Sequence, residues 1–343
     1  MEFVRRELKG ALPRPDWWLV RPDEIIAQCE NVKKGKKEIA AYTPGGFPVY
    51  VITYGPERKV EREINWPSAT GSPRPELYTL AGPQCLMIIG GVHGEEPEGV
   101  MAVLNLMSLL ETGKDLAGNP NPELVELAEN YRLVLMPCVN MDGRAISPDC
   151  YVGAQFEDFA DIVYTRLKDG TQLRWPALKE YYPMPMDQVE TLGTYYNADG
   201  YNIQLDAAPG NICTEEAKAI LRVAHREHID LFVNLHSDGV EHIIISESLH
   251  YPVNVETCKA LRKVWLTIRG YDPETEYCPS TQTDIDNAVE LATGAPSFTF
   301  EFGLTHAPSH ERLVDEGFGI LKAVFLYGKD NVYADRRKIA GKK

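Results

Sequence analysis

The segment CLMIIGGVHGEE, residues 85–96, joins a continuous apolar run to a polar turn. An uncharged run such as residues 85–90 is typical of a strand buried on both faces of a parallel sheet. The turn that follows is rich in glycine and ends in histidine and glutamate side chains. Helical spacing of apolar residues then begins at Pro97 and extends to Leu110. We therefore predict a strand, a turn and a helix in succession.

The same alternation continues along the chain. We predict further strands at Glu38–Tyr42, Val49–Tyr54, Arg132–Cys138, Asp230–Leu235 and Phe298–Phe302, and helices at Thr214–His228, Val255–Arg269 and about His310–Leu326. The Thr43-Pro44-Gly45-Gly46 turn predicts a hairpin between the first two strands. Strands that alternate with helices indicate a parallel arrangement. The expected fold is α/β, a single domain with a mixed, mostly parallel sheet covered by helices on both faces.

We expect residues 1–343 to form this one domain. Residues 1–35 are a lead-in that ends in a short helix, and residues 336–343 are a basic tail. Residues 143–200 form a long excursion that is rich in aromatic residues and proline. Such long connectors more often build a functional wall than merely join two elements.

The composition excludes several classes of function. The chain has 343 residues, a net charge of −15, 44% hydrophobic and 25% charged residues, which is typical of an ordinary folded protein. The acidic balance argues against nucleic-acid and anionic-membrane partners. No run approaches the roughly 20 apolar residues of a membrane span, and no signal peptide is seen. The seven cysteines are scattered, without a CxxC pair, so we expect a cytoplasmic protein without a disulfide framework.

Candidate ligands follow the predicted strands. His93 and Glu96 follow the strand at 85–90, and His236 follows the strand at 230–235. Ligands bind beyond the carboxyl ends of parallel strands, and residues three apart on a turn that enters a helix can point the same way. Two histidines and a glutamate are a known ligand set of catalytic zinc, which keeps one position open for water. We therefore predict one zinc per chain.

Glu301 lies between two phenylalanines in the last predicted strand. A buried carboxylate is costly unless it is paired or lies near a cation. An isolated HxxE pair occurs often by chance. The combination of this pair with His236 and a glutamate in an apolar strand is far less common by chance. We therefore place Glu301 at the same centre.

The order of these motifs resembles that of the zinc carboxypeptidases of the M14 type, over about residues 38–326. The family's Gly-x-His-x-x-Glu, Leu-His-Ser and Phe-Thr-Phe-Glu motifs match residues 91–96, 235–237 and 298–301, and its Asn-Pro-Asp-Gly loop is similar to residues 140–143. The resemblance implies that His93, Glu96 and His236 bind zinc. It also implies that Glu301 is the general base and acid.

The resemblance fails at the segment that holds the substrate's C-terminal carboxylate. The family's Gly-x-Asp-x-Asn-Arg-Asn corresponds to residues 200–206, where Gln204 replaces the asparagine and Leu205 replaces the arginine. Leucine cannot form the bidentate bond that arginine makes to a carboxylate. Asn202 and Gln204 are the candidates that this segment leaves for substrate binding, and Arg144 is a third.

A second family arginine polarises the carbonyl of the bond that is cleaved. Arg144, Arg166 and Arg174 are candidates, and we favour Arg174 because it adjoins Trp175. The alternative is an exposed Arg174 that stacks on an aromatic side chain. Tyr277 precedes Glu301 at about the spacing of the family's mobile tyrosine, which makes it a further catalytic candidate.

The sequence thus predicts a zinc-dependent hydrolase of an amide bond, carboxypeptidase-like, with atypical recognition of the substrate carboxylate. Glu301 would deprotonate water that attacks the carbonyl of a peptide or small amide, and then protonate the leaving amine. One alternative is an N-acyl amino acid deacylase of the aspartoacylase and succinylglutamate desuccinylase type. Another is a non-catalytic zinc-binding module, although an intact Glu301 argues against it. The oligomeric state and physiological substrate stay open.

Overall fold

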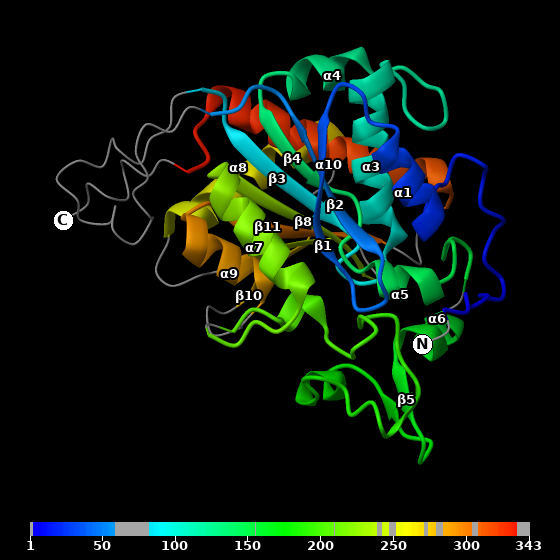
Figure 1. The fold of residues 1–343 in the computed structure, drawn as a ribbon. Coiled ribbons are helices and arrows are strands. Elements are labelled where there is room, and N and C mark those ends of the chain that lie inside the picture. The colour runs from blue at the N-terminus through cyan, green and yellow to red at the C-terminus, as the bar shows by residue number, and fades with distance from the viewer. Residues whose placement is uncertain are drawn as a thin grey trace.

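The computed structural model describes residues 3–58, 82–154, 156–208, 210–238, 242–246, 252–270, 274–278, 284–303 and 308–334. Within these ranges an eight-stranded sheet has the order β1-β2-β4-β3-β8-β11-β9-β10 (Figure 1). Its strands are β1 Lys36–Tyr42, β2 Pro48–Tyr54, β3 Cys85–Gly90, β4 Arg132–Met136, β8 Leu231–Asp238, β9 His242–Ser246, β10 Glu274–Cys278 and β11 Ser297–Gly303.

The central strands β4, β3, β8 and β11 are parallel, as are β9 and β10. Antiparallel pairs join β1 to β2, β2 to β4 and β11 to β9. The mixed, mostly parallel sheet is therefore confirmed. Because β3, β8 and β11 are parallel neighbours, their carboxyl ends meet at one edge of the sheet.

Helices cover both faces, as predicted. Leu86 and Ile88 of β3 face one apolar core, which is shared with α1 Pro22–Glu30, α3 Pro97–Thr112, α4 Pro122–Ala128, α8 Pro252–Arg269 and α10 His310–Asp330. Met87 and Ile89 face the opposite core, under α7 Glu215–Glu227 and α9 Ile285–Thr293. In Figure 1, α7 and α9 lie in front of the sheet and α3 and α10 lie behind it. The alternation along β3 explains why this strand is apolar throughout.

Most predicted elements are found close to their expected bounds. The strand predicted to reach Cys138 ends at Met136, because Pro137 has no N–H to donate to a neighbouring strand. The hairpin turn is confirmed by the hydrogen bond from Thr43 N–H to Phe47 O, 2.9 Å. The helices α4 and α9 and the strands β9 and β10 were not predicted. Residues 59–81 and the predicted basic tail at 336–343 lie outside the described residues.

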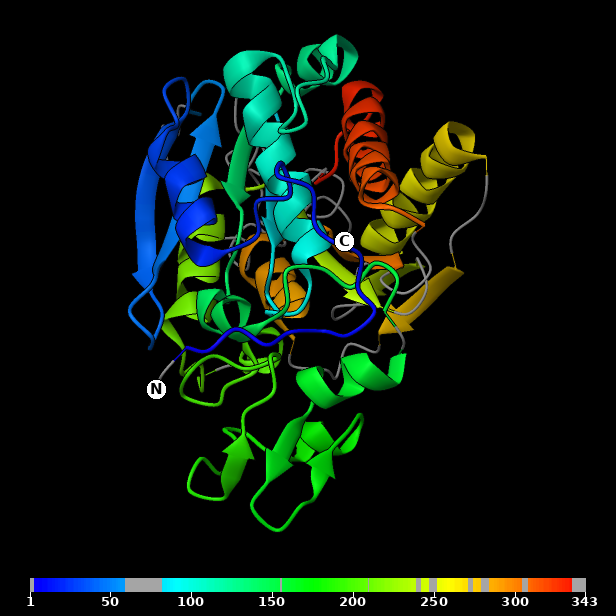
Figure 2. The ribbon, with the colours of Figure 1, turned by 90° about the vertical axis from the view of Figure 1, so that its right-hand side faces the viewer.

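The excursion at 143–200 carries its own small sheet. After α5 Met141–Ile146 come α6 Phe156–Val163, β5 Thr165–Leu167, β6 Gln172–Leu173, η2 Ala177–Glu180 and β7 Val189–Thr191. The three strands have the order β6-β5-β7 and lie below the main sheet in Figures 1 and 2. Near its end, Thr194 O accepts a hydrogen bond from Gly94 N–H, 3.0 Å, so the excursion reaches the turn after β3.

The described helices include none that combines the length and the apolar character needed to cross a membrane.

Candidate metal centre

The turn after β3 and the end of β8 bring three candidate ligands together. Gly91 takes a φ of +61°, which turns the chain sharply after β3. Glu96 then directly precedes α3, and β8 pairs with β3 in parallel, which sets His236 beside the turn. One ligand atom from each of His93, Glu96 and His236 lies within 4.8 Å of the other two, and all three residues are buried. The sequence prediction that these residues converge is confirmed.

The Glu96 carboxylate lies between the two imidazoles. Its Oε1 is 2.8 Å from His93 Nδ1, and its Oε2 is 2.9 Å from His236 Nδ1. Burial by itself favours the neutral acid, but His93 and His236 outweigh it and lower the pKa of Glu96 to about 2. Glu96 is therefore held as a carboxylate.

Asn202 determines which nitrogen of His93 carries hydrogen. Asn202 Oδ1 accepts the N–H of Gln204, 3.0 Å, and also lies 3.2 Å from His93 Nε2. A carbonyl oxygen can only accept, so His93 Nε2 must donate, and in the neutral ring the lone pair is on Nδ1. That lone pair faces Glu96.

The donor set fits a zinc ion. A lone pair on His93 Nδ1 and a carboxylate oxygen 2.8 Å away repel each other unless a cation or a proton lies between them. Two imidazole nitrogens and a carboxylate are ligands that zinc prefers. Hydrogen bonding of the second ring nitrogen, as Asn202 provides for His93, is usual for histidines that bind metal.

Glu301 lies next to this centre on the adjoining strand. The parallel register of β11 and β8 pairs Glu301 with His236. Its side chain is buried, and its Oε2 has no hydrogen-bond partner among the described residues. Burial raises the pKa of Glu301 well above its ordinary value, and Glu96 and Asp238 add to the effect while His236 opposes it. Such a carboxyl group can accept and return a proton close to the centre.

The side chain of Gln204 is bound within the protein. It lies in the short helical turn η3 Ile203–Leu205 and donates from Nε2 to Asp286 Oδ2, 2.9 Å. Its Oε1 accepts from Asn234 Nδ2, 2.9 Å. Asp286 is only 1% exposed and also accepts from Ser297 and Asn234. One N–H of the Gln204 amide is therefore bound to the protein's own Asp286.

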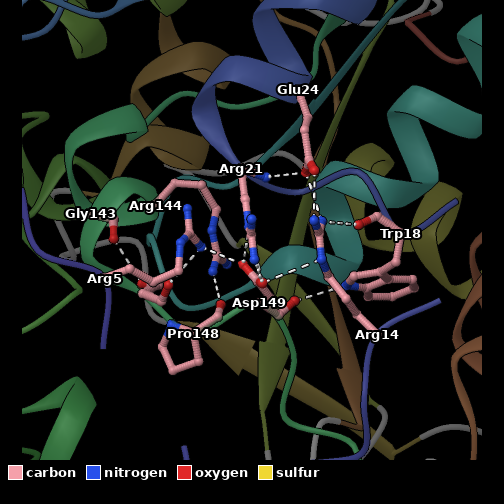
Figure 3. Close-up of polar contacts among 10 residues, drawn as sticks. Arg5, Arg14, Trp18, Arg21, Glu24, Gly143, Arg144, Pro148 and Asp149 are labelled. Atoms are coloured by element: carbon pink, nitrogen blue, oxygen red, sulfur yellow. Dashed lines mark hydrogen bonds and ion pairs between the residues drawn. The ribbon is translucent and has the colours of Figure 1, made fainter. Parts of the chain in front are cut away.

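The candidate arginines make other contacts. Arg144 is fully buried and donates to Pro148 O (Figure 3). Arg174 is exposed and donates to Gln172 Oε1, 2.7 Å, while Arg166 lies 3.4 Å from Asp161 Oδ1. Lys179, and not Arg174, lies over the Trp175 ring, 3.9 Å from its centroid. The described contacts show no hydrogen bond or ion pair from these arginines to the proposed ligands or Glu301, so their roles stay predictions.

Tyr277 lies on β10, where it pairs with Ile245 of β9. Ile245 in turn pairs with Phe298, so the backbone of Tyr277 is level with a residue three positions before Glu301. Its side chain lies outside the described residues. The catalytic role of Tyr277 therefore stays a prediction.

Several residues near the centre were not predicted. The Tyr195 ring meets the His93 ring edge to face, with 4.5 Å between centroids. Two buried acids bind residues of β8 that flank His236: Glu98 accepts from Ser237, and Asp286 accepts from Asn234. Glu98 lies two residues after Glu96 in an otherwise apolar helix, and this acidic side chain could have indicated from the sequence that it belongs near the site. Tyr195 comes from the excursion, whose weak periodicity offers no sequence signal for its position.

Comparisons with known proteins bear on the fold and on residues 61–169. Residues 61–169 match the family model described as zinc carboxypeptidase. No curated protein matches the chain. The fold is also found in metallo-carboxypeptidases of known structure. That of Burkholderia cenocepacia is 15% identical, with a TM-score of 0.56 over 89% of this chain and 68% of that one.

Two further structures are similar. A Pseudomonas aeruginosa metallo-carboxypeptidase, solved with (2-guanidinoethylmercapto)succinic acid, is 14% identical with a TM-score of 0.50, over 90% of this chain and 68% of that one. Thrombin activatable fibrinolysis inhibitor is 13% identical, with a TM-score of 0.52 over 91% of this chain and 75% of that one. The fold is thus that of the metallocarboxypeptidases. The resemblance to the M14-type zinc carboxypeptidases that was drawn from the motifs is confirmed by the family model over residues 61–169 and, for the fold, by these structures.

Proposed function

We propose that this protein is a zinc-dependent hydrolase of amide bonds. The observation that carries the proposal is the convergence of His93, Glu96 and His236 beside Glu301 at one edge of the sheet. These three residues would hold one zinc, which when bound would polarise the substrate's carbonyl group and lower the pKa of water.

Glu301 moves the proton in the proposed reaction. It takes a proton from water as the water oxygen bonds to the carbonyl carbon, and it gives that proton to the nitrogen as the carbon–nitrogen bond breaks. Its Oε2, which has no hydrogen-bond partner among the described residues, and its place beside His236 support this role. Arg174 and Tyr277 remain candidates for polarising the carbonyl and covering the substrate.

The substrate is proposed to be a peptide or small amide without a free carboxylate next to the cleaved bond. Leu205 offers no donor, and the amide of Gln204 is bound to Asp286. Gln204, Asn234 and Ser297 all donate to Asp286, so the amide that replaces the family's asparagine already binds an acidic side chain of the protein.

The test combines metal removal with Glu301→Gln. Hydrolysis of peptides, amidated peptides and N-acyl amino acids is measured before and after chelation, and again after zinc is restored. We expect Glu301→Gln to keep zinc and fold but to lower kcat by about 10²–10⁴-fold, because glutamine cannot take the water's proton.

Glu216→Gln is the matched control, since Glu216 is a fully buried glutamate on α7 that accepts from Asn197. It should keep the wild-type kcat. Hydrolysis that survives chelation, or a Glu301→Gln variant as active as Glu216→Gln, would contradict the proposal. Hydrolysis of N-acyl amino acids alone would favour the deacylase alternative.

A further inference from the structure

A buried hydrogen bond joins the two elements that carry the proposed ligands. Ser237 Oγ donates to Glu98 Oε2 at 2.8 Å. Ser237 directly follows His236 on β8, and Glu98 lies two residues after Glu96 in the first turn of α3. Their exposed fractions are 7% and 2%, so water does not compete for the bond. The bond therefore links the Glu96 side of the centre to the His236 side.

The backbones of α3 and β8 touch at the same place. A Cβ atom at Gly99 would lie 2.5 Å from Leu235 O and 2.9 Å from Leu235 Cβ. Only glycine allows the two backbones to come this close, so the first turn of α3 packs directly against the end of β8. The Glu98–Ser237 bond holds the two elements at that contact.

Packing alone does not account for a glutamate at position 98. Burying a carboxyl group is costly, and one hydrogen bond recovers only part of the cost. The second oxygen of Glu98, Oε1, has no hydrogen-bond partner among the described residues. An apolar side chain would suit the surrounding helix, which is otherwise buried through Val100, Met101 and Val103. The specific property of Glu98 is its bond to the strand that bears His236.

On the basis of the zinc site proposed above, we propose that Glu98 and Ser237 are positioning residues, whose hydrogen bond fixes the separation of Glu96 from His236. Zinc requires its nitrogen and oxygen ligands at about 2 Å. A pair of elements that is already held at the right separation loses less conformational freedom when zinc binds. Without the bond, the same ligands are present but hold zinc less tightly.

The test measures zinc affinity by competition with a chromophoric chelator. Ser237→Ala should bind zinc about tenfold more weakly, by analogy with residues that support metal ligands. Glu98→Gln keeps an oxygen that accepts from Ser237 and should stay close to the wild-type affinity. Combining Ser237→Ala with Glu98→Ala should weaken zinc no more than Glu98→Ala alone, because both changes remove one bond.

Ser297→Ala is the matched control. Ser297 Oγ also donates to a buried carboxylate, Asp286 Oδ1, at 2.8 Å, but that bond does not join two ligand-bearing elements. Ser297→Ala should keep the wild-type zinc affinity, while the metal-free forms of both serine variants melt at similar temperatures.

Equal zinc affinity in Ser237→Ala and Ser297→Ala would overturn the positioning role and leave the proposed function standing. A wild-type protein that binds no zinc would overturn the proposed function as well.

Discussion

The hydrogen bond between His93 Nε2 and Asn202 Oδ1, 3.2 Å, directs the other nitrogen of the ring toward Glu96. We expect Asn202→Leu to lower zinc affinity about 10–100-fold, because the acceptor that orients the ring is lost. Asn202→Asp keeps an acceptor and should bind zinc at least as tightly as the wild type. Chelator competition on the purified proteins measures both. A leucine variant with wild-type affinity would show that Asn202 does not position His93.

At the residue scale, the sequence was informative where the chemistry is local. His93 and Glu96 share one turn, and His236 and Glu301 interrupt apolar strands, so each was visible without a structure. Asn202 was predicted to bind substrate, and that role stays a prediction; the contacts described for its side-chain oxygen are with His93 and Gln204. The contact with His93 joins residues 109 positions apart, and no local pattern encodes it.

At the scale of elements, the Asp149 carboxylate binds three arginines of the N-terminal segment. Asp149 pairs with Arg5 Nη1 at 2.5 Å, Arg14 Nε at 3.3 Å and Arg21 Nη2 at 2.6 Å (Figure 3). Glu24 of α1 also binds Arg14, at 2.7 Å. These pairs fasten the segment that leads into α1 to the start of the excursion.

We expect Asp149→Asn to lower the free energy of unfolding by about 1 kcal/mol at pH 7, since the pairs are partly exposed. Burial alone would raise the pKa of Asp149, but Arg21, Arg5 and Arg14 outweigh it and lower that pKa. The stabilisation is therefore complete above the ordinary aspartate pKa, about 3.9, and is lost as the pH falls through the lowered value.

Urea unfolding at pH 7 and at pH 3 measures the difference between Asp149→Asn and the wild type. The difference should shrink at the lower pH. Asp16→Asn is the control, because Asp16 is exposed in the same segment, and it should leave stability unchanged. A difference that grows toward pH 3 would contradict the role given to Asp149.

There are physical reasons why some elements were not predicted from the sequence. Strands β5, β6 and β7 are two or three residues long, which is too short to show alternation. The apolar strands β3, β4 and β11 were found because burial on both faces removes polar residues from them. The hydrophobic pattern predicted a mixed, mostly parallel sheet. It could not predict the positions of β9 and β10, because the order of strands depends on tertiary packing.

For the whole molecule, we propose that no arginine of the 200–206 segment binds the substrate's C-terminal carboxylate, and this predicts which substrates are cleaved. A blocked dipeptide and its C-terminal amide are compared by kcat/KM, and we expect the amide to be cleaved at least as well as the acid. Leu205 offers no donor in place of the family's arginine, and the Gln204 amide already donates to Asp286. A preference for the free acid above about 100-fold, roughly 2.7 kcal/mol, would mean that a carboxylate grip exists.

The most direct measurement is the zinc content of the purified wild type and of His236→Ala. We expect one zinc per chain in the wild type and little in His236→Ala, because a buried ligand from β8 is removed. His225→Ala, at an exposed histidine on α7, should keep the wild-type content. A His236→Ala protein that still carries one zinc per chain would contradict the assignment of His93, Glu96 and His236 as the metal centre.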